Sequence, residues 1–160
     1  MERSAWISEC GRYRYKLWRR WSMGPAATFI MLNPSTADAE VDDPTIRRCI
    51  GFAKREGCGS FNVVNLYAWR ATKPNALWEH QACRGSHNDE ALSEATDPLV
   101  EGPVIAAWGA HWSVRWGSEK ALRAGLAGRT KRLLCLGKTK DGHPRHPLYV
   151  RADAPLIPLF

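Results

Sequence analysis

Residues 27–36 read Ala-Thr-Phe-Ile-Met-Leu-Asn-Pro-Ser-Thr, a short apolar run followed at once by polar turn residues. A run of this kind is typical of a strand that is buried on both faces of a sheet. Runs of similar character occur at residues 61–66, 103–107 and 132–136. The sequence therefore predicts that these four segments are the interior strands of one sheet.

Helix signals lie between the predicted strands. Asp43 is suited to cap a helix, Pro44 fits its first turn, and Gly57 is suited to end it. Ser86 and Asp89 resemble a capping box, which opens a second helix. Both helices connect one predicted strand to the next.

Strands that alternate with helices indicate an α/β domain with right-handed crossovers. We expect a three-layer sandwich around a central, mostly parallel, four-stranded sheet. A third helix is expected within residues 113–127, and residues 13–21 are predicted to form an edge strand or one arm of a hairpin. The length of 160 residues fits a single domain over residues 1–160.

Composition restricts the functional classes. No apolar run approaches the roughly 20 residues that span a bilayer, so no membrane partner is expected. Five cysteines, an odd number, together with an N-terminus that does not resemble a signal peptide, favour reduced thiols and a cytoplasmic location. The formal net charge of +7 favours a polyanionic partner, with nucleic acid or a nucleotide as the expected one.

The carboxyl ends of parallel strands are where α/β sheets bind ligands. In this sequence they carry polar, aromatic and basic residues. The candidate binding residues at these ends are Pro34 and Ser35 after the first strand, Asn65, Tyr67 and Arg70 at the second, Trp108 after the third, and Lys138 and Arg145 after the fourth.

Asn65 is unusual because it interrupts an apolar strand. A buried amide must find hydrogen-bond partners, either in the protein or in a ligand. An amide offers both a donor and an acceptor, as reading a pyrimidine edge requires. We favour a ligand over a structural partner.

The candidate catalytic residues are Asn33, Asp42, His143 and His146. Asn33 follows a buried strand directly, where its side chain could position a water molecule. Asp42 lies in an acidic loop and is less well explained than Asp43 by helix capping. His143 and His146 lie in a loop that two prolines make rigid, which suits imidazoles held in one pose.

Basic residues accumulate in the second half of the chain. Residues 108–151 contain ten Lys or Arg and two Asp or Glu. This excess flanks the expected site, so Lys138 and Arg145 are predicted to contact phosphates, although a solvated face would have the same composition.

Other motifs are weaker. Residues 137–139 (Gly-Lys-Thr) lack the earlier glycine of a phosphate-binding loop, since position 132 is arginine. The motifs of a zinc deaminase do not occur. His80, Cys83 and His87 have a spacing that could suit a metal, but exposed helix ends explain them equally well. We predict no metal and no cofactor.

The chain resembles a family known as domain of unknown function 1643, over most of its length. The likeness rests on residues 32–37 (Leu-Asn-Pro-Ser-Thr-Ala), 42–45 (Asp-Asp-Pro-Thr), 65–72 (Asn-Leu-Tyr-Ala-Trp-Arg-Ala-Thr), 108–109 (Trp-Gly) and 142–149 (Gly-His-Pro-Arg-His-Pro-Leu-Tyr).

The same landmarks are similar to a reduced version of the uracil-DNA glycosylase superfamily. In that superfamily a Gly-x-Asn-Pro or Asp-Pro motif positions the hydrolytic water, and Asn33-Pro34 is similar to it, with Met31 in place of the glycine. Asn65 resembles the asparagine that reads uracil. The residue pairs 143–144 and 146–147 are both His-Pro, and either resembles the pair that contacts the uracil carbonyl.

This resemblance implies an N-glycosylase that releases uracil or a modified base from DNA. Asn33, helped by Asp38 or Asp42, would orient the water, and His143 or His146 would stabilise the departing base. Two alternatives stay open: a non-catalytic module that binds nucleic acid or a nucleotide, and an enzyme that acts on a free nucleotide.

Overall fold

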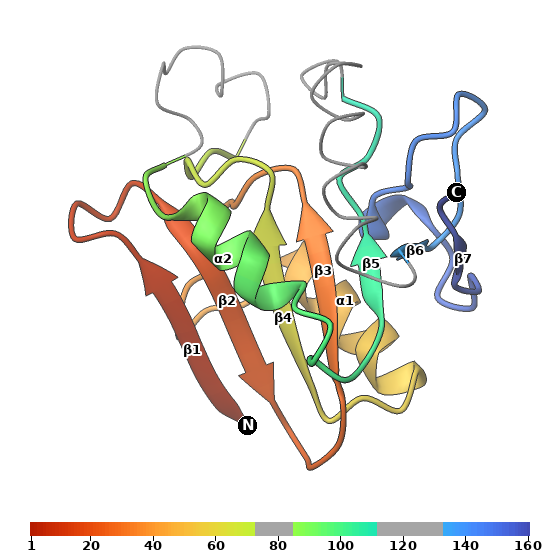
Figure 1. Ribbon diagram of the computed structural model, residues 1–160, viewed down its shortest axis with the longest axis horizontal. Coiled ribbons are helices and arrows are strands. Elements are labelled where there is room, and N and C mark those ends of the chain that lie inside the picture. Colours follow the sequence, from red (N-terminus) through yellow and green to blue (C-terminus); the bar gives the residue numbers. More distant parts are fainter. Residues whose placement is uncertain (73–84, 112–132) are drawn as a thin grey trace.

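The computed structural model describes residues 1–72, 85–111 and 133–160, which are coloured by sequence in Figure 1. Within these residues the chain forms one mixed seven-stranded sheet and two α-helices. The elements in chain order are β1 (Glu2–Ile7), β2 (Arg14–Arg20), β3 (Ala26–Met31), α1 (Pro44–Arg55), β4 (Ser60–Asn65), α2 (Asn88–Ala95), β5 (Val104–Ala106), β6 (Leu133–Cys135), the 3-10 helix η2 (Pro147–Tyr149) and β7 (Ile157–Pro158).

The strand order across the sheet is β1-β2-β4-β3-β5-β6-β7. β3 runs parallel to both β4 and β5, and β5 runs parallel to β6. The four predicted strands therefore exist, but the prediction of a four-stranded sheet was wrong. An antiparallel hairpin, β1 and β2, extends one side, and the two-residue strand β7 extends the other. Strand β7 is too short and too proline-rich to leave a periodic signal.

Residues 13–21 form a hairpin arm, as one of the two alternatives predicted. They contain β2, which pairs with β1 on one side and with β4 on the other. The edge of the sheet on this side is therefore β1.

The strand side chains alternate between two apolar layers. Phe29 and Met31 pack with Ile46 of α1, whereas Ile30 and Leu32 pack with Leu92 of α2. The two helices consequently cover opposite faces of the sheet, with α2 in front of it and α1 behind it in Figure 1. β3 and β4 end level with each other, because Met31 pairs with Asn65.

Helix α1 begins and ends as predicted. The Asp43 side chain accepts a hydrogen bond from the backbone N–H of Ile46 at 2.9 Å, and Pro44 is the first helical residue. Gly57 follows the helix with a φ of 75°, a left-handed conformation that glycine adopts at little cost.

The predicted capping box of α2 was wrong. The helix starts at Asn88, and its cap residue His87 makes no side-chain capping bond. Gly85 has a φ of 79°, and a Cβ there would lie 2.8 Å from the Tyr15 ring. The turn that precedes α2 is therefore packed tightly against the hairpin. The helix expected within residues 113–127 lies outside the described residues.

In the described ranges, neither α-helix combines the length and the apolar character that crossing a lipid bilayer requires.

Candidate functional site

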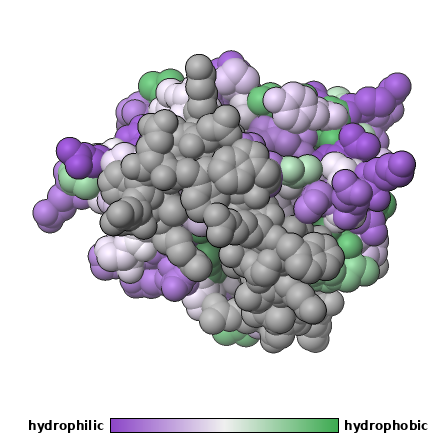
Figure 2. All heavy atoms as spheres, turned by 90° about the horizontal axis from the view of Figure 1, so that it is seen from above, coloured by the Kyte–Doolittle hydropathy of each residue, from purple (hydrophilic) through white to green (hydrophobic). Residues whose placement is uncertain are grey.

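A pocket of about 700 Å³ opens at the carboxyl ends of β3, β4 and β5. Its wall includes Met31, Val63 and the first turn of α1, so it lies on the face of the sheet that α1 covers. The volume is within the range of about 300–1,000 Å³ typical of small-molecule sites. Figure 2 is viewed from above the strand ends of Figure 1, and hydrophilic side chains project from much of the coloured surface.

Asn65 lines this pocket and is fully buried. Its backbone is fixed from the other face of the sheet, because Nδ2 of Asn88 donates to the carbonyl oxygens of Asn65 at 2.9 Å and Leu66 at 3.1 Å. In contrast, neither Nδ2 nor Oδ1 of the Asn65 side chain has a hydrogen-bond partner among the described residues. A buried amide without partners costs free energy, so this side chain is available to a ligand.

Trp108 contributes a second unpartnered group. Its side chain lines the pocket and is 1% exposed, and no residue in the described ranges accepts a hydrogen bond from its indole Nε1–H. Buried indole N–H groups normally find an acceptor. The pocket wall thus contains two donors and one acceptor, on Asn65 and Trp108, that the described protein leaves unused.

Asn33 connects two loops beside the pocket. Its Nδ2 donates to the carbonyl oxygens of Ala71 at 2.7 Å and Pro34 at 3.1 Å. The backbone N–H of Ala71 in turn donates to the Pro34 oxygen at 2.9 Å. Because both amide protons are used, Oδ1 is the remaining polar atom of Asn33, and it can only accept. Ser35 also lines the pocket, whereas Pro34 is buried and does not.

The structure distinguishes the two candidate histidines. His146 lines the pocket, and its Nδ1 accepts a hydrogen bond from the backbone N–H of Leu148 at 3.2 Å. His143 does not line it; its backbone N–H donates to Oγ1 of Thr139 at 3.1 Å.

The protonation of His146 follows from its surroundings. Burial lowers the pKa of His146 below 6.5, an effect that the nearby Asp43 carboxylate partly offsets. In the neutral ring the proton is on Nε2, since Nδ1 acts as an acceptor. His146 therefore presents an N–H donor at neutral pH.

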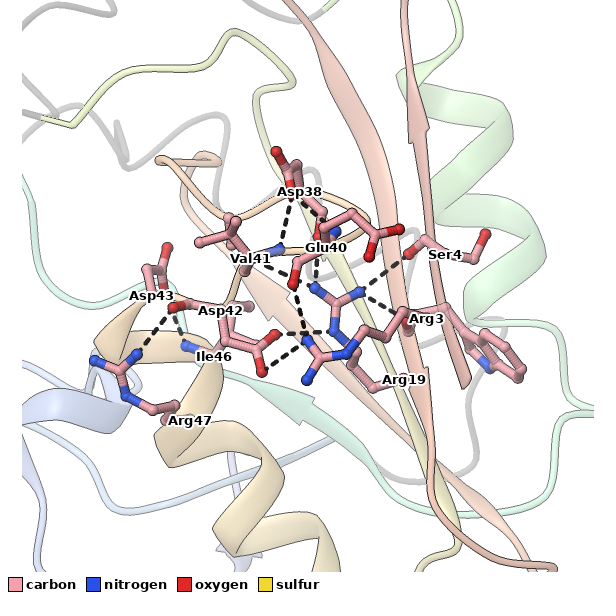
Figure 3. A network of polar contacts seen from close by, with 12 residues as sticks. Arg3, Ser4, Arg19, Asp38, Glu40, Val41, Asp42, Asp43, Ile46 and Arg47 are labelled. Carbon is pink, nitrogen blue, oxygen red and sulfur yellow. Dashed lines mark hydrogen bonds and ion pairs between the residues drawn. The ribbon is translucent and has the colours of Figure 1, made fainter. Parts of the chain in front are cut away.

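Asp42 does not line the pocket and is directed instead towards Arg3 and Arg19 of the hairpin (Figure 3). It pairs with Nε of Arg19 at 2.9 Å and with Nη1 of Arg3 at 3.2 Å, which ties its loop to the hairpin. The neighbouring Asp43 lines the pocket instead. The acidic loop thus supplies one carboxylate to the pocket, and the sequence analysis had assigned that residue only a capping role.

The remaining predicted residues surround the pocket. Arg145 lines it, and its Nε donates to the carbonyl oxygen of Lys138 at 3.3 Å. Lys138 itself is exposed and outside the wall. Arg70 lines a neighbouring pocket of about 360 Å³, and Tyr67 packs against the apolar layer on the α2 side.

The sequence analysis missed several lining residues, among them Arg14 and Tyr149. Arg14, at the start of β2, is 2% exposed and lines the pocket. Tyr149 is 78% exposed at the pocket, with its ring centroid 5.6 Å from that of His146. Arg14 lies in a hairpin far from the predicted strand ends, so no local pattern identified it.

Metal binding finds no support within the described segments, which contain no group of three His, Cys, Asp or Glu side chains suited to a metal ion. His80 and Cys83, two of the three residues with metal-like spacing, lie outside those segments.

Comparison with known proteins identifies one matching family. No curated protein and no solved structure matches the chain, so the likeness to uracil-DNA glycosylases stays a proposal. The family model described as "Protein of unknown function (DUF1643)" matches residues 14–148, a span that runs from Arg14 at the pocket to Leu148. Because this match covers most of the chain, the protein belongs to the DUF1643 family.

Proposed function

We propose that this protein has a uracil-DNA glycosylase-like fold, binds a nucleobase in the pocket, and hydrolyses the N-glycosidic bond of uracil or a modified base in DNA. The observation that carries the proposal is the Asn65 side chain, which is fully buried, lines the pocket, and finds no partner for either of its polar atoms within the described segments.

An amide at this position suits a pyrimidine edge. Nδ2 can donate to a base carbonyl while Oδ1 accepts from a ring N–H, so both groups are satisfied together. The indole N–H of Trp108 provides a further donor to a carbonyl oxygen. A flipped-out base that makes these bonds compensates the buried groups, which supports recognition of a base rather than of an apolar ligand.

Two side chains suit the hydrolysis. Oδ1 of Asn33 can accept from a water molecule and orient it towards the sugar, because its Nδ2 is held by Ala71 and Pro34. The Nε2–H of His146 can donate to the departing base and stabilise its negative charge. The carboxylate of Asp43, rather than that of Asp42, supplies a negative charge for an oxocarbenium-like transition state.

The test is a base-release assay on single- and double-stranded oligonucleotides that carry uracil or a series of modified bases. Asn33→Ala should abolish release but keep affinity, because a group that positions water acts mainly in the transition state. Asn65→Ala should weaken binding.

Asn62→Ala is the matched control. Asn62 is a buried asparagine on the same strand, three residues before Asn65, and it does not line the pocket. This variant should behave as wild type. Tight binding without base release from any substrate would indicate that the protein is a non-catalytic binding module and not an enzyme. Absence of both would contradict the proposal.

A further inference from the structure

Arg14 is a buried arginine whose hydrogen bonds are incomplete. Its Nη1 donates to the carbonyl oxygen of Ala37 at 2.8 Å, while its buried Nε has no hydrogen-bond partner in the part of the chain that the structure describes. The side chain is 2% exposed and lines the pocket. Burial also lowers the pKa of Arg14 to about 10, so the group stays charged at neutral pH.

Arg19, on the same strand, shows what a satisfied buried arginine looks like in this fold (Figure 3). It pairs with Asp42, and its guanidinium donates to the carbonyl oxygens of Trp18 at 2.9 Å and Asp38 at 2.5 Å. Arg14 is equally buried but forms no ion pair with any described residue. An uncompensated buried charge is expensive, which makes the difference between the two arginines informative.

The described wall of the pocket carries more positive than negative charge. Arg14 and Arg145 line it, and Asp43 is its one acidic residue. One carboxylate oxygen of Asp43 already caps α1 through the N–H of Ile46. The acid raises the pKa of Arg14 but makes no ion pair with it. With His146 neutral, the positive charge of the described wall exceeds its negative charge by one. A ligand that carries one negative charge would balance it.

We propose that the ligand carries a phosphate group that pairs with Arg14, so that the substrate is a nucleotide unit rather than a free base or a nucleoside. A guanidinium presents its donors in a planar fork that matches phosphate oxygens, and the free Nε belongs to that fork. This inference rests on the proposed function, because Asn65 is taken to hold the base of the same ligand. The phosphate comes either from a free mononucleotide or from a nucleotide within a strand.

The test compares ligands that differ only in the phosphate. Binding of deoxyuridine, its 5′- and 3′-monophosphates, and a trinucleotide with central deoxyuridine is measured by calorimetry with the wild-type protein. One of the phosphate-bearing ligands should bind at least about tenfold more tightly than the nucleoside, because bonds to charged groups are the stronger ones. Preference for a monophosphate or for the trinucleotide supports the proposal and identifies the source of the phosphate.

Two variants assign the effect to Arg14. Arg14→Gln should remove the preference for phosphate, and Arg14→Lys should keep part of it, since lysine retains the charge without the fork. Lys54→Gln removes the same charge at the far end of α1, outside the pocket wall, and should keep the whole preference. If Arg14→Gln does not fold, the preference for phosphate-bearing ligands still tests the proposal when it is compared between the wild-type protein and Arg14→Lys.

Equal affinity of the wild-type protein for all four ligands would overturn the proposal, as would a phosphate preference that Arg14→Gln retains. The two proposals fail separately. If nucleoside binding depends on Asn65 but phosphate adds nothing, only the phosphate site is wrong. Arg14 could instead confer a phosphate preference that changes neither with Asn65→Ala nor with the identity of the base. In that case only the proposed recognition of the base by Asn65 is wrong.

Discussion

Nδ2 of Asn88 donates to the backbone oxygen of Asn65 at 2.9 Å, which links the first residue of α2 to the residue at the end of β4. A second bond from the same nitrogen reaches the Leu66 oxygen at 3.1 Å. The backbone of Asn65 is therefore held from the α2 face of the sheet, while its side chain lines a pocket on the α1 face. The element that positions the proposed base-reading residue is a helix on the opposite side of the sheet.

Asn88→Ala should lower the free energy of unfolding by about 1–3 kcal/mol, because two buried carbonyl oxygens each lose a donor. Urea unfolding measures the change. Asn62→Ala, also at a buried asparagine, removes an amide whose Oδ1 has no partner, and should cost less. An equal decrease in the free energy of unfolding in both variants would show that the two hydrogen bonds of Asn88 add no stability of their own.

Asn65→Ala should leave the free energy of unfolding within about 1 kcal/mol of wild type, because the amide makes no hydrogen bond that could be lost. The same substitution should weaken base binding by about tenfold or more, through loss of the one fully buried side-chain amide in the described part of the pocket wall. A residue retained for stability would show the reverse, with a large change in unfolding and none in binding.

Arg19→Met should destabilise the fold by about 3–5 kcal/mol, since it leaves the Asp42 carboxylate without its buried partner. Arg14→Met should cost clearly less, because it removes a charge that has no ion pair and breaks one bond to Ala37. Denaturant titrations of the two variants, run side by side, provide the comparison. A larger cost at Arg14 would indicate that this arginine is structural.

His146 should make stability depend on pH on the acidic side. Its folded-state pKa lies below 6.5, so the unfolded chain binds the proton more readily. The stabilisation is complete above that value and is lost as the pH falls through the lower folded-state pKa. Protonation would also remove the Nδ1 acceptor of the Leu148 N–H.

His146→Gln should therefore flatten the dependence of unfolding free energy on pH below about 6.5. His111 has a pKa that burial also lowers, and it remains in this variant, so a residual slope is expected. A slope identical to wild type would show that His146 is solvated.

Lys138→Ala combined with Arg145→Ala should reduce the salt dependence of oligonucleotide binding by about one to two units of slope, if both side chains contact phosphates. Unfolding should change little, since both residues are exposed. Lys54→Ala, another exposed lysine, is the control and should leave the slope unchanged. If the salt dependence of binding is unaltered in the double variant, these two charges do not contact phosphates and serve only solubility.

The apolar runs and the caps of α1 were readable from the sequence because they are local. Buried strand segments must be apolar, and Asp43, Pro44 and Gly57 satisfy backbone requirements within a few residues of themselves. The location of the site followed from the rule for parallel strands. Six of the predicted site residues, Asn33, Ser35, Asn65, Trp108, Arg145 and His146, line one pocket.

The tertiary structure determines which of two similar, neighbouring residues lines the pocket. Asp42 and Asp43 are adjacent, but the hairpin arginines pair with Asp42, so only Asp43 reaches the pocket. His146 rather than His143 lines the wall, because η2 begins directly after it. No local pattern separates such neighbours, since their positions depend on contacts with distant segments.

The sequence by itself determined the α/β class, the buried strands and the edge of the sheet where the pocket opens, because these depend on periodicity and on short-range backbone chemistry. Only the tertiary structure added Arg14 to the pocket, since it comes from a hairpin that is distant in sequence and enters the sheet beside β4. Only the tertiary structure also showed that the side-chain polar atoms of Asn65 have no partner among the residues it describes. Whether a buried group is satisfied depends on every segment that packs around it, and a single sequence pattern does not contain that information.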